Sequence, residues 1–126
     1  MISIQEADQL VVHHGATILD IRSMIEYCGG HICGSTLVAT GTPPLNSAQT
    51  RALKAKLLHI LQDHNDYHPI IVYCKKGIRS TIAYGILQES GFYNVFNMGG
   101  IENKPLIDFA LGKITVSRLR ICTCKK

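Results

Sequence analysis

The sequence contains no tryptophan, and only 6% of its 126 residues are aromatic. Proteins that bind single-stranded nucleic acid stack bases on aromatic side chains interleaved with basic ones, and no such array is present. No apolar stretch approaches the roughly 20 residues that a membrane-spanning helix needs. The N-terminus turns polar and acidic at Gln5-Glu6 without a basic region ahead of an apolar one, so we expect no secretory signal. We therefore predict a protein that binds neither nucleic acid nor membranes.

The sequence also has little excess of positive over negative charge and no cysteine spacing typical of disulfides. The formal net charge is only +4, and outside residues 75–79 and 113–126 the basic side chains are scattered. The cysteines form an odd set without the spacing of a disulfide framework: Cys28, Cys33, Cys74, Cys122 and Cys124. A reducing compartment is the simplest setting for such a set, so we expect a cytoplasmic protein. The sequence has no internal repeat and no low-complexity segment.

What the sequence does contain is a regular alternation of short apolar segments and helical patterns. With 46% apolar residues, a chain of 126 residues is long enough for one domain with its own core. Short apolar strands that alternate with helices are typical of a parallel sheet covered by helices on both faces, so the predicted fold class is α/β. The predicted strands are 17–21, 35–39, 70–73 and 93–98, and the predicted helices are 3–13, 23–28, 46–64, 79–90 and 105–111.

The domain is expected to span residues 1–112. Residues 113–126 form a basic tail whose structure the pattern leaves open, and the alternation in 114–117 could add a strand or meet another subunit.

Cys74 follows the apolar run Ile70-Ile71-Val72-Tyr73 and precedes a short basic loop that leads into a helix. Ligands of parallel sheets bind outside the carboxyl ends of the strands, where Asp20 also lies, so the two residues are expected to face one site. Unpaired backbone N–H groups at a helix N-terminus attract an anion, and nearby basic residues favour a thiolate. The segment therefore predicts an activated cysteine nucleophile. The alternative is a small buried structural cysteine.

Three segments together resemble the rhodanese family of sulfurtransferases. The first is Leu19-Asp20-Ile21-Arg22, which precedes Glu26-Tyr27 and Gly30-His31-Ile32-Cys33-Gly34-Ser35; the second is the loop 74–79, and the third is 94–100. They occur in the family's order and cover most of residues 1–105, so the resemblance implies a small, single rhodanese-like domain. In two places the sequence departs from the family. Cys33 stands where proline is usual in the family, and we interpret it as a local packing substitution. No tryptophan follows Gly100, where many members carry one, so the shape of the substrate pocket is expected to differ from theirs.

The resemblance also implies a reaction. Cys74 would take sulfur from a small anionic donor such as thiosulfate, form a persulfide and pass the sulfur to cyanide or a thiol, with glutathione and thioredoxin among the candidate acceptors. The residues that would hold the substrate follow the cysteine: Lys75, Lys76, Gly77, Ile78, Arg79 and Ser80. The supporting residues would be Asp20, Arg22, Glu26 and His31, with Arg22 paired to Glu26. No cofactor and no metal are expected, and the oligomeric state is left open.

Two other functions are alternatives to sulfur transfer. A phosphatase is disfavoured because the loop from Cys74 to Arg79 is one residue shorter than that of tyrosine phosphatases, and Tyr73 replaces their histidine. A rhodanese-like binding or regulatory module with little turnover is the main alternative. Two departures from the family favour it, the missing tryptophan and the tail that matches no part of the family pattern. The segment Cys122-Thr123-Cys124 lacks the second ligand pair of a zinc site, so we interpret it as accidental, with a resolving role toward Cys74 left open.

Overall fold

The computed structural model describes residues 1–124 and has a four-stranded parallel sheet at its centre. The strands lie in the order β3 (Thr36–Leu37), β1 (Thr17–Asp20), β4 (Ile70–Cys74) and β5 (Val95–Gly100). Asp20 is in register with Tyr73, so the ends of β1 and β4 are adjacent, as expected for these two segments.

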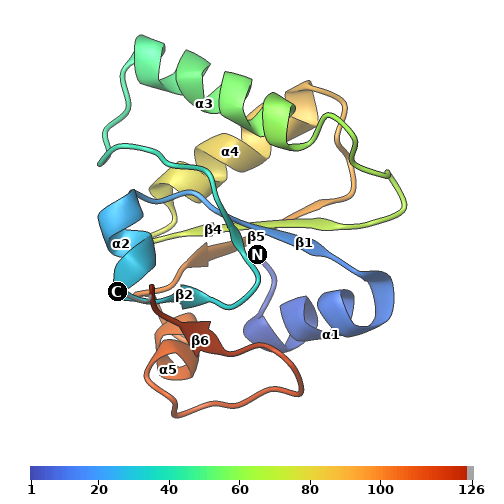
Figure 1. The fold of residues 1–126 in the computed structure, drawn as a ribbon, viewed down its shortest axis with the longest axis vertical. Coiled ribbons are helices and arrows are strands. Elements are labelled where there is room, and N and C mark those ends of the chain that lie inside the picture. The colour runs from blue at the N-terminus through green and yellow to red at the C-terminus, as the bar shows by residue number, and fades with distance from the viewer. Residues whose placement is uncertain (125–126) are drawn as a thin grey trace.

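Helices cover both faces of this sheet (Figure 1). On one face lie α3 (Ser47–Ile60) and α4 (Ile78–Glu89), and on the other lie α1 (Ile4–His14) and α5 (Leu106–Ala110). Strand β4 is buried along its whole length, and its successive side chains enter the two core clusters in turn. The predicted α/β class, a parallel sheet with helices on both faces, is confirmed.

Local signals set the ends of the helices. Ser3 and Glu6 form a capping box at the start of α1, and Gly15 ends that helix with a left-handed φ of 61°. The short helix α2 (Met24–Gly29) begins with a second capping box, made by Ser23 and Glu26. Because α2 directly follows the extension of β1, it lies at the carboxyl end of the sheet.

The tail folds back over the domain, which the sequence did not predict. Strand β6 (Ile121–Cys122) pairs antiparallel with β2 (His31–Ile32), and Figure 1 shows these two short strands side by side, away from the central sheet. The strand that the tail adds is thus not the 114–117 segment. Lys125 and Lys126, part of the predicted basic tail, lie outside the described residues.

Four of the five cysteines are paired, so the expectation of unpaired cysteines is wrong in this structure. Disulfides join Cys28 to Cys124 and Cys33 to Cys122, with Cα–Cα distances of 4.6 and 5.0 Å. The cause is the path of the tail, which brings Cys122 and Cys124 next to α2 and β2. The pair in the tail is therefore not accidental, and Cys33 does more than pack. The cysteine argument for a cytoplasmic location is removed as well.

The helices among residues 1–124 are all too short or too polar to cross a membrane. The same residues contain no group of three or more His, Cys, Asp or Glu side chains arranged to hold a metal ion.

Candidate active site

Cys74 is the last residue of β4 and the free cysteine among residues 1–124. Its side chain is 1% exposed. The backbone N–H groups of Gly77 and Ser80 donate to its Sγ at 3.1 and 3.3 Å. Both donors lie at the N-terminal end of α4, so the sulfur sits where the helix dipole favours negative charge. These two N–H groups form a cradle for the sulfur.

Two glycines allow the loop after Cys74 to close tightly. Gly77 is the N-cap of α4 and has a φ of 98°, which side chains disfavour. Gly100 lies opposite the loop, and a Cβ there would come within 2.5 Å of the Lys76 Cα and 2.6 Å of the Lys75 carbonyl oxygen. Residues after β5 also hold the loop: the side-chain amide of Asn103 donates to the Lys76 carbonyl at 2.9 Å. Neither Gly100 nor Asn103 is predicted from the sequence as a contact of the loop.

Arg79 is buried and bound to a carboxylate. Its Nη1 and Nη2 donate to the two carboxylate oxygens of Glu26 at 2.8 and 3.0 Å, and its side chain is 2% exposed. The hydrogen bonds from Arg79 lower the pKa of Glu26 to about 2, against the opposing effect of burial. Arg79 Nε is buried and has no hydrogen-bond partner within residues 1–124. This paired arginine therefore ties α2 to the first turn of α4 and keeps one unused donor.

The expected pairing of Arg22 with Glu26 is wrong. Arg22 instead binds the carboxylate of Asp20 with its Nε and Nη2, the shortest distance being 2.7 Å, and Nη2 also donates to the Gly30 carbonyl. Arg22 lies two residues beyond Asp20 in extended chain, so both side chains point to the same side of the strand. Burial alone would lower the pKa of Arg22, but the hydrogen bonds and charge of Asp20 raise it.

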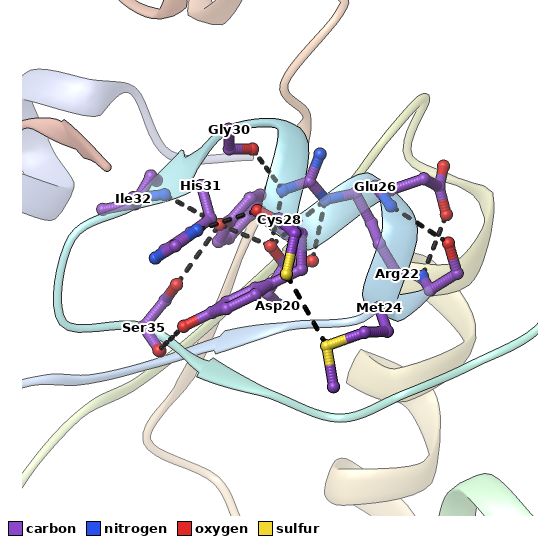
Figure 2. Close-up of polar contacts among 12 residues, drawn as sticks. Asp20, Arg22, Met24, Glu26, Cys28, Gly30, His31, Ile32 and Ser35 are labelled. Carbon is purple, nitrogen blue, oxygen red and sulfur yellow. Dashed lines mark hydrogen bonds and ion pairs between the residues drawn. The ribbon is translucent and has the colours of Figure 1, made fainter. Parts of the chain in front are cut away.

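Tyr73, the neighbour of Cys74, joins this buried network. Its hydroxyl donates to Asp20 at 2.7 Å and accepts the N–H of Ile32 at 3.0 Å, and Ser35 Oγ lies 3.3 Å away. Burial, followed by the charge of Asp20, raises the pKa of Tyr73, so it remains a neutral donor. Figure 2 shows Asp20 and Arg22 beside Gly30, Ile32 and Ser35. The network fixes the segment that precedes Cys74.

A cavity of about 430 Å³ opens at Cys74. Among the predicted site residues, Cys74, Lys75, Lys76, Ile78, Arg79 and Glu26 line it. Gly77 and Ser80 do not line the cavity, but their N–H groups contact Cys74 Sγ. Asp20, Arg22 and His31 do not line the cavity; His31 hydrogen-bonds the Tyr27 carbonyl at 2.8 Å and stacks on its ring. Sequence reasoning missed four lining residues: Ser23, Ile25, Thr42 and Pro43. The topology could have found Thr42 and Pro43, because their loop follows the carboxyl end of β3.

This loop and fold have counterparts among known proteins. The Rhodanese-like domain family matches residues 3–103, most of the chain. The chain belongs to the rhodanese-like domain family. This rhodanese-like domain is 30% identical over 99 residues to thiosulfate sulfurtransferase GlpE of Pseudoalteromonas translucida, covering 79% of this chain and 81% of that one. It is 33% identical over 100 residues to rhodanese-like domain-containing protein 17 of Arabidopsis thaliana, and the match spans 79% of this chain and 63% of that protein.

Solved structures show the same fold. A rhodanese with anions from E. coli superposes with a TM-score of 0.53 at 24% identity, covering 71% of this chain and 92% of that one. Protein hp1203 of Helicobacter pylori gives a TM-score of 0.58 at 19% identity, covering 95% of this chain and 93% of that one. The family match of the rhodanese-like domain ends at residue 103, so the disulfide-bonded tail lies beyond it.

Proposed function

We propose that this rhodanese-like domain is a sulfurtransferase that carries sulfane sulfur on Cys74. The observation that supports this most directly is the geometry of the sulfur: two backbone N–H groups donate to Sγ at the base of a cavity of about 430 Å³. The similarity to a thiosulfate sulfurtransferase adds support.

The donor in this proposal is thiosulfate or a similar small anion. Lys75, Lys76 and Arg79 all line the cavity, and the Arg79 guanidinium is paired with Glu26. Lys75 is partly neutralised, because its Nζ lies 3.8 Å from Glu102 Oε2 and both side chains are more than two-fifths exposed. Lys76, which forms no ion pair within residues 1–124, is therefore the main group proposed to hold the sulfonate end of the donor.

The proposed reaction has two displacement steps. The Cys74 thiolate attacks the outer sulfur of thiosulfate, the sulfur–sulfur bond of the donor breaks, and sulfite leaves with the bonding electron pair. The product is an anionic Cys74 persulfide, which the N–H groups of Gly77 and Ser80 stabilise. Cyanide or a thiolate then attacks the terminal sulfur, and the Cys74 thiolate is released. No cofactor takes part in either step.

The test is thiocyanate formation from thiosulfate and cyanide by wild type and by Cys74→Ser. We expect the variant to lose turnover by at least about 1,000-fold, because the nucleophile is removed. Matching unfolding curves for the two proteins would show that the fold is intact. Turnover retained by Cys74→Ser would contradict the mechanism.

A binding module with little turnover is the second candidate. It is favoured by two isoleucines at the mouth of the cavity, Ile25 and Ile78, which are 87% and 54% exposed. Exposed apolar side chains grouped around a cavity are suited to a protein partner. Wild type that is folded but inactive with thiosulfate and mercaptopyruvate, together with partner binding that survives Cys74→Ser, would favour this function.

A further inference from the structure

Residues 113–124, here called the C-terminal strap, are seated on the domain by contacts that do not involve cysteine. The backbone N–H groups of Ser117, Arg118 and Leu119 donate to the Asp8 carboxylate on α1 at 2.9 to 3.2 Å. Asp8 is 1% exposed and Leu119 is 4% exposed, with Leu119 packed in the core cluster under α1. A buried carboxylate that accepts three backbone N–H groups specifies where the strap lies.

The disulfides join this strap to the segment that carries α2 and β2. Cys28 lies in the last turn of α2, and Cys33 directly follows β2. Backbone hydrogen bonds accompany both disulfides: the Cys124 N–H donates to the Cys28 carbonyl at 3.2 Å, and the Cys33 N–H donates to the Arg120 carbonyl at 2.8 Å. Cys124 is exposed, and the three other disulfide-bonded cysteines are half-buried. A reductant in solution can therefore reach them.

One connection runs from the strap to the catalytic loop through α2. Glu26 is two residues from Cys28 on this six-residue helix. Its carboxylate holds Arg79, which lies in the first turn of α4, between the two N–H donors Gly77 and Ser80 in the chain. Figure 2 shows Glu26 and Cys28 on the same short helix. Movement of α2 would thus move the partner of Arg79.

A second connection runs through β2. Cys33 is next to Ile32, whose N–H donates to the Tyr73 hydroxyl at 3.0 Å. Tyr73 precedes Cys74 directly and also holds Asp20. The other edge of β2 pairs with β6 of the strap. When the strap is in place, β2 is therefore held by Tyr73 on one side and by β6 on the other. The position of Tyr73, directly before Cys74, is held through the same contacts.

We propose that the two disulfides of the strap are a thiol–disulfide exchange site that controls the loop around Cys74. Oxidised, they hold the strap on α2 and β2 and keep the loop ordered; reduced by a dithiol, they leave the strap held only by its contacts with Asp8, the core and β2, and α2 and the loop loosen. The effect on activity rests on the proposed sulfur transfer, whereas the disulfides and the change in order do not.

The exchange is balanced for each disulfide. A thiolate of the dithiol attacks one cysteine sulfur, the disulfide breaks, the other cysteine leaves as a thiolate, and a mixed disulfide forms. The second thiol of the reductant then attacks its own sulfur in the mixed disulfide, that bond breaks and the first cysteine leaves, so the products are two cysteine thiols and an oxidised, cyclic reductant. Two electrons and two protons pass to each pair, and the thiol acceptors proposed for sulfur transfer belong to the same chemical class as the reductant.

The first measurement is the number of thiols. Iodoacetamide added to denatured, unreduced protein should label one cysteine, Cys74, and after reduction it should label all five. Five labelled cysteines without reduction would overturn the proposal.

The second measurement is amide hydrogen exchange before and after reduction with a phosphine. We expect protection in α2 and residues 75–80 to fall by about 10-fold or more, while α3, on the far face, keeps its protection. The double variant Cys122→Ser with Cys124→Ser should show the same loss without a reductant, and Thr123→Ser, between them, should not. Unchanged exchange at α2 after reduction would overturn control of the loop.

The third measurement is thiocyanate formation after the phosphine has been removed, and we expect about 10-fold less in the reduced protein. Equal rates in the two states would overturn the link to activity. A protein inactive in both states would count against the proposed sulfur transfer, and hydrogen exchange would then decide the proposal about the strap.

Discussion

Gly100 is where β5 passes closest to the loop that follows Cys74. A methyl group at this position would lie 2.5 Å from Lys76 Cα and 2.6 Å from the Lys75 carbonyl, and both are backbone atoms that cannot swing away. We expect Gly100→Ala to lower the free energy of unfolding by about 1 to 3 kcal/mol and to lower sulfur transfer, because the loop must shift. Urea unfolding measures the first effect and thiocyanate formation the second.

A second glycine provides the matched control. Gly85 lies within α4, and a Cβ there would meet nothing within 4 Å. Gly85→Ala should therefore raise the free energy of unfolding by about 0.5 to 1 kcal/mol, as removal of a glycine from a helix does. If Gly100→Ala unfolds at the same urea concentration as wild type, the close approach is not a constraint.

The pair of Glu26 and Arg79 should make stability depend on pH in acid. The pKa of Glu26 is about 2 in the folded protein against 4.5 for a free side chain, chiefly because Arg79 donates two hydrogen bonds. The unfolded chain thus takes up the proton first, so the contribution of the pair is complete above pH 4.5 and is lost as the pH falls toward 2. At neutral pH we expect Glu26→Gln to cost on the order of 2 to 3 kcal/mol.

The comparison to make is the difference in unfolding free energy between wild type and Glu26→Gln, measured from pH 7 to pH 2.5. It should shrink as the pH falls below 4.5. Glu89→Gln is the control, because Glu89 is exposed and makes no ion pair within residues 1–124. A difference that stays constant with pH would contradict the assigned pairing.

At the scale of elements, helix α1 and the strap depend on one carboxylate. Burial would raise the pKa of Asp8, but the N–H groups of Leu119, Arg118 and Ser117 together lower it below its usual value. Asparagine offers one acceptor oxygen in place of two, and its amide N–H₂ would face backbone N–H groups. We expect Asp8→Asn to cost about 1 to 3 kcal/mol and to speed amide exchange at residues 117–119.

The control for this change is Asp63→Asn, since Asp63 is exposed and its side chain makes no hydrogen bond within residues 1–124. Exchange at residues 117–119 that is equal in the two variants would show that Asp8 does not hold the strap. Both variants carry the same chemical change, so a difference between them comes from the contacts of Asp8.

The elements that the sequence predicts well are those with a strong local signal. The apolar run before Cys74 predicts β4, and the predicted helices 3–13 and 23–28 agree with α1 and α2 within one residue at each end. Strands β2 and β6 have two residues each, too few for any periodic pattern, and they exist only because the strap returns to the domain. The partner of Arg22 was misassigned for a related reason, since the choice between Asp20 and Glu26 depends on where α2 lies.

At the scale of the whole molecule, the cysteines show what sequence reasoning cannot supply. Cys74 was predicted from its own surroundings, a buried strand followed by a basic loop, and the structure places it at the base of a cavity. The pairing of the other four depends on a chain reversal across 89 and 96 residues. No local spacing encodes such a reversal, so an odd set of cysteines looked unpaired.

The same separations predict a large effect of reduction on thermal stability. A disulfide that closes a loop of roughly 100 residues restricts the unfolded chain enough to contribute about 4 to 5 kcal/mol, and a second one nested within it adds less. We expect a phosphine to lower the Tm on the order of 10 °C or more. Cys74→Ser keeps both disulfides, so the phosphine should lower its Tm by the same amount. A variant with serine at all four paired positions should already have the lower Tm, and the phosphine should not change it. A Tm that reduction leaves unchanged in wild type would contradict disulfide stabilisation of the fold.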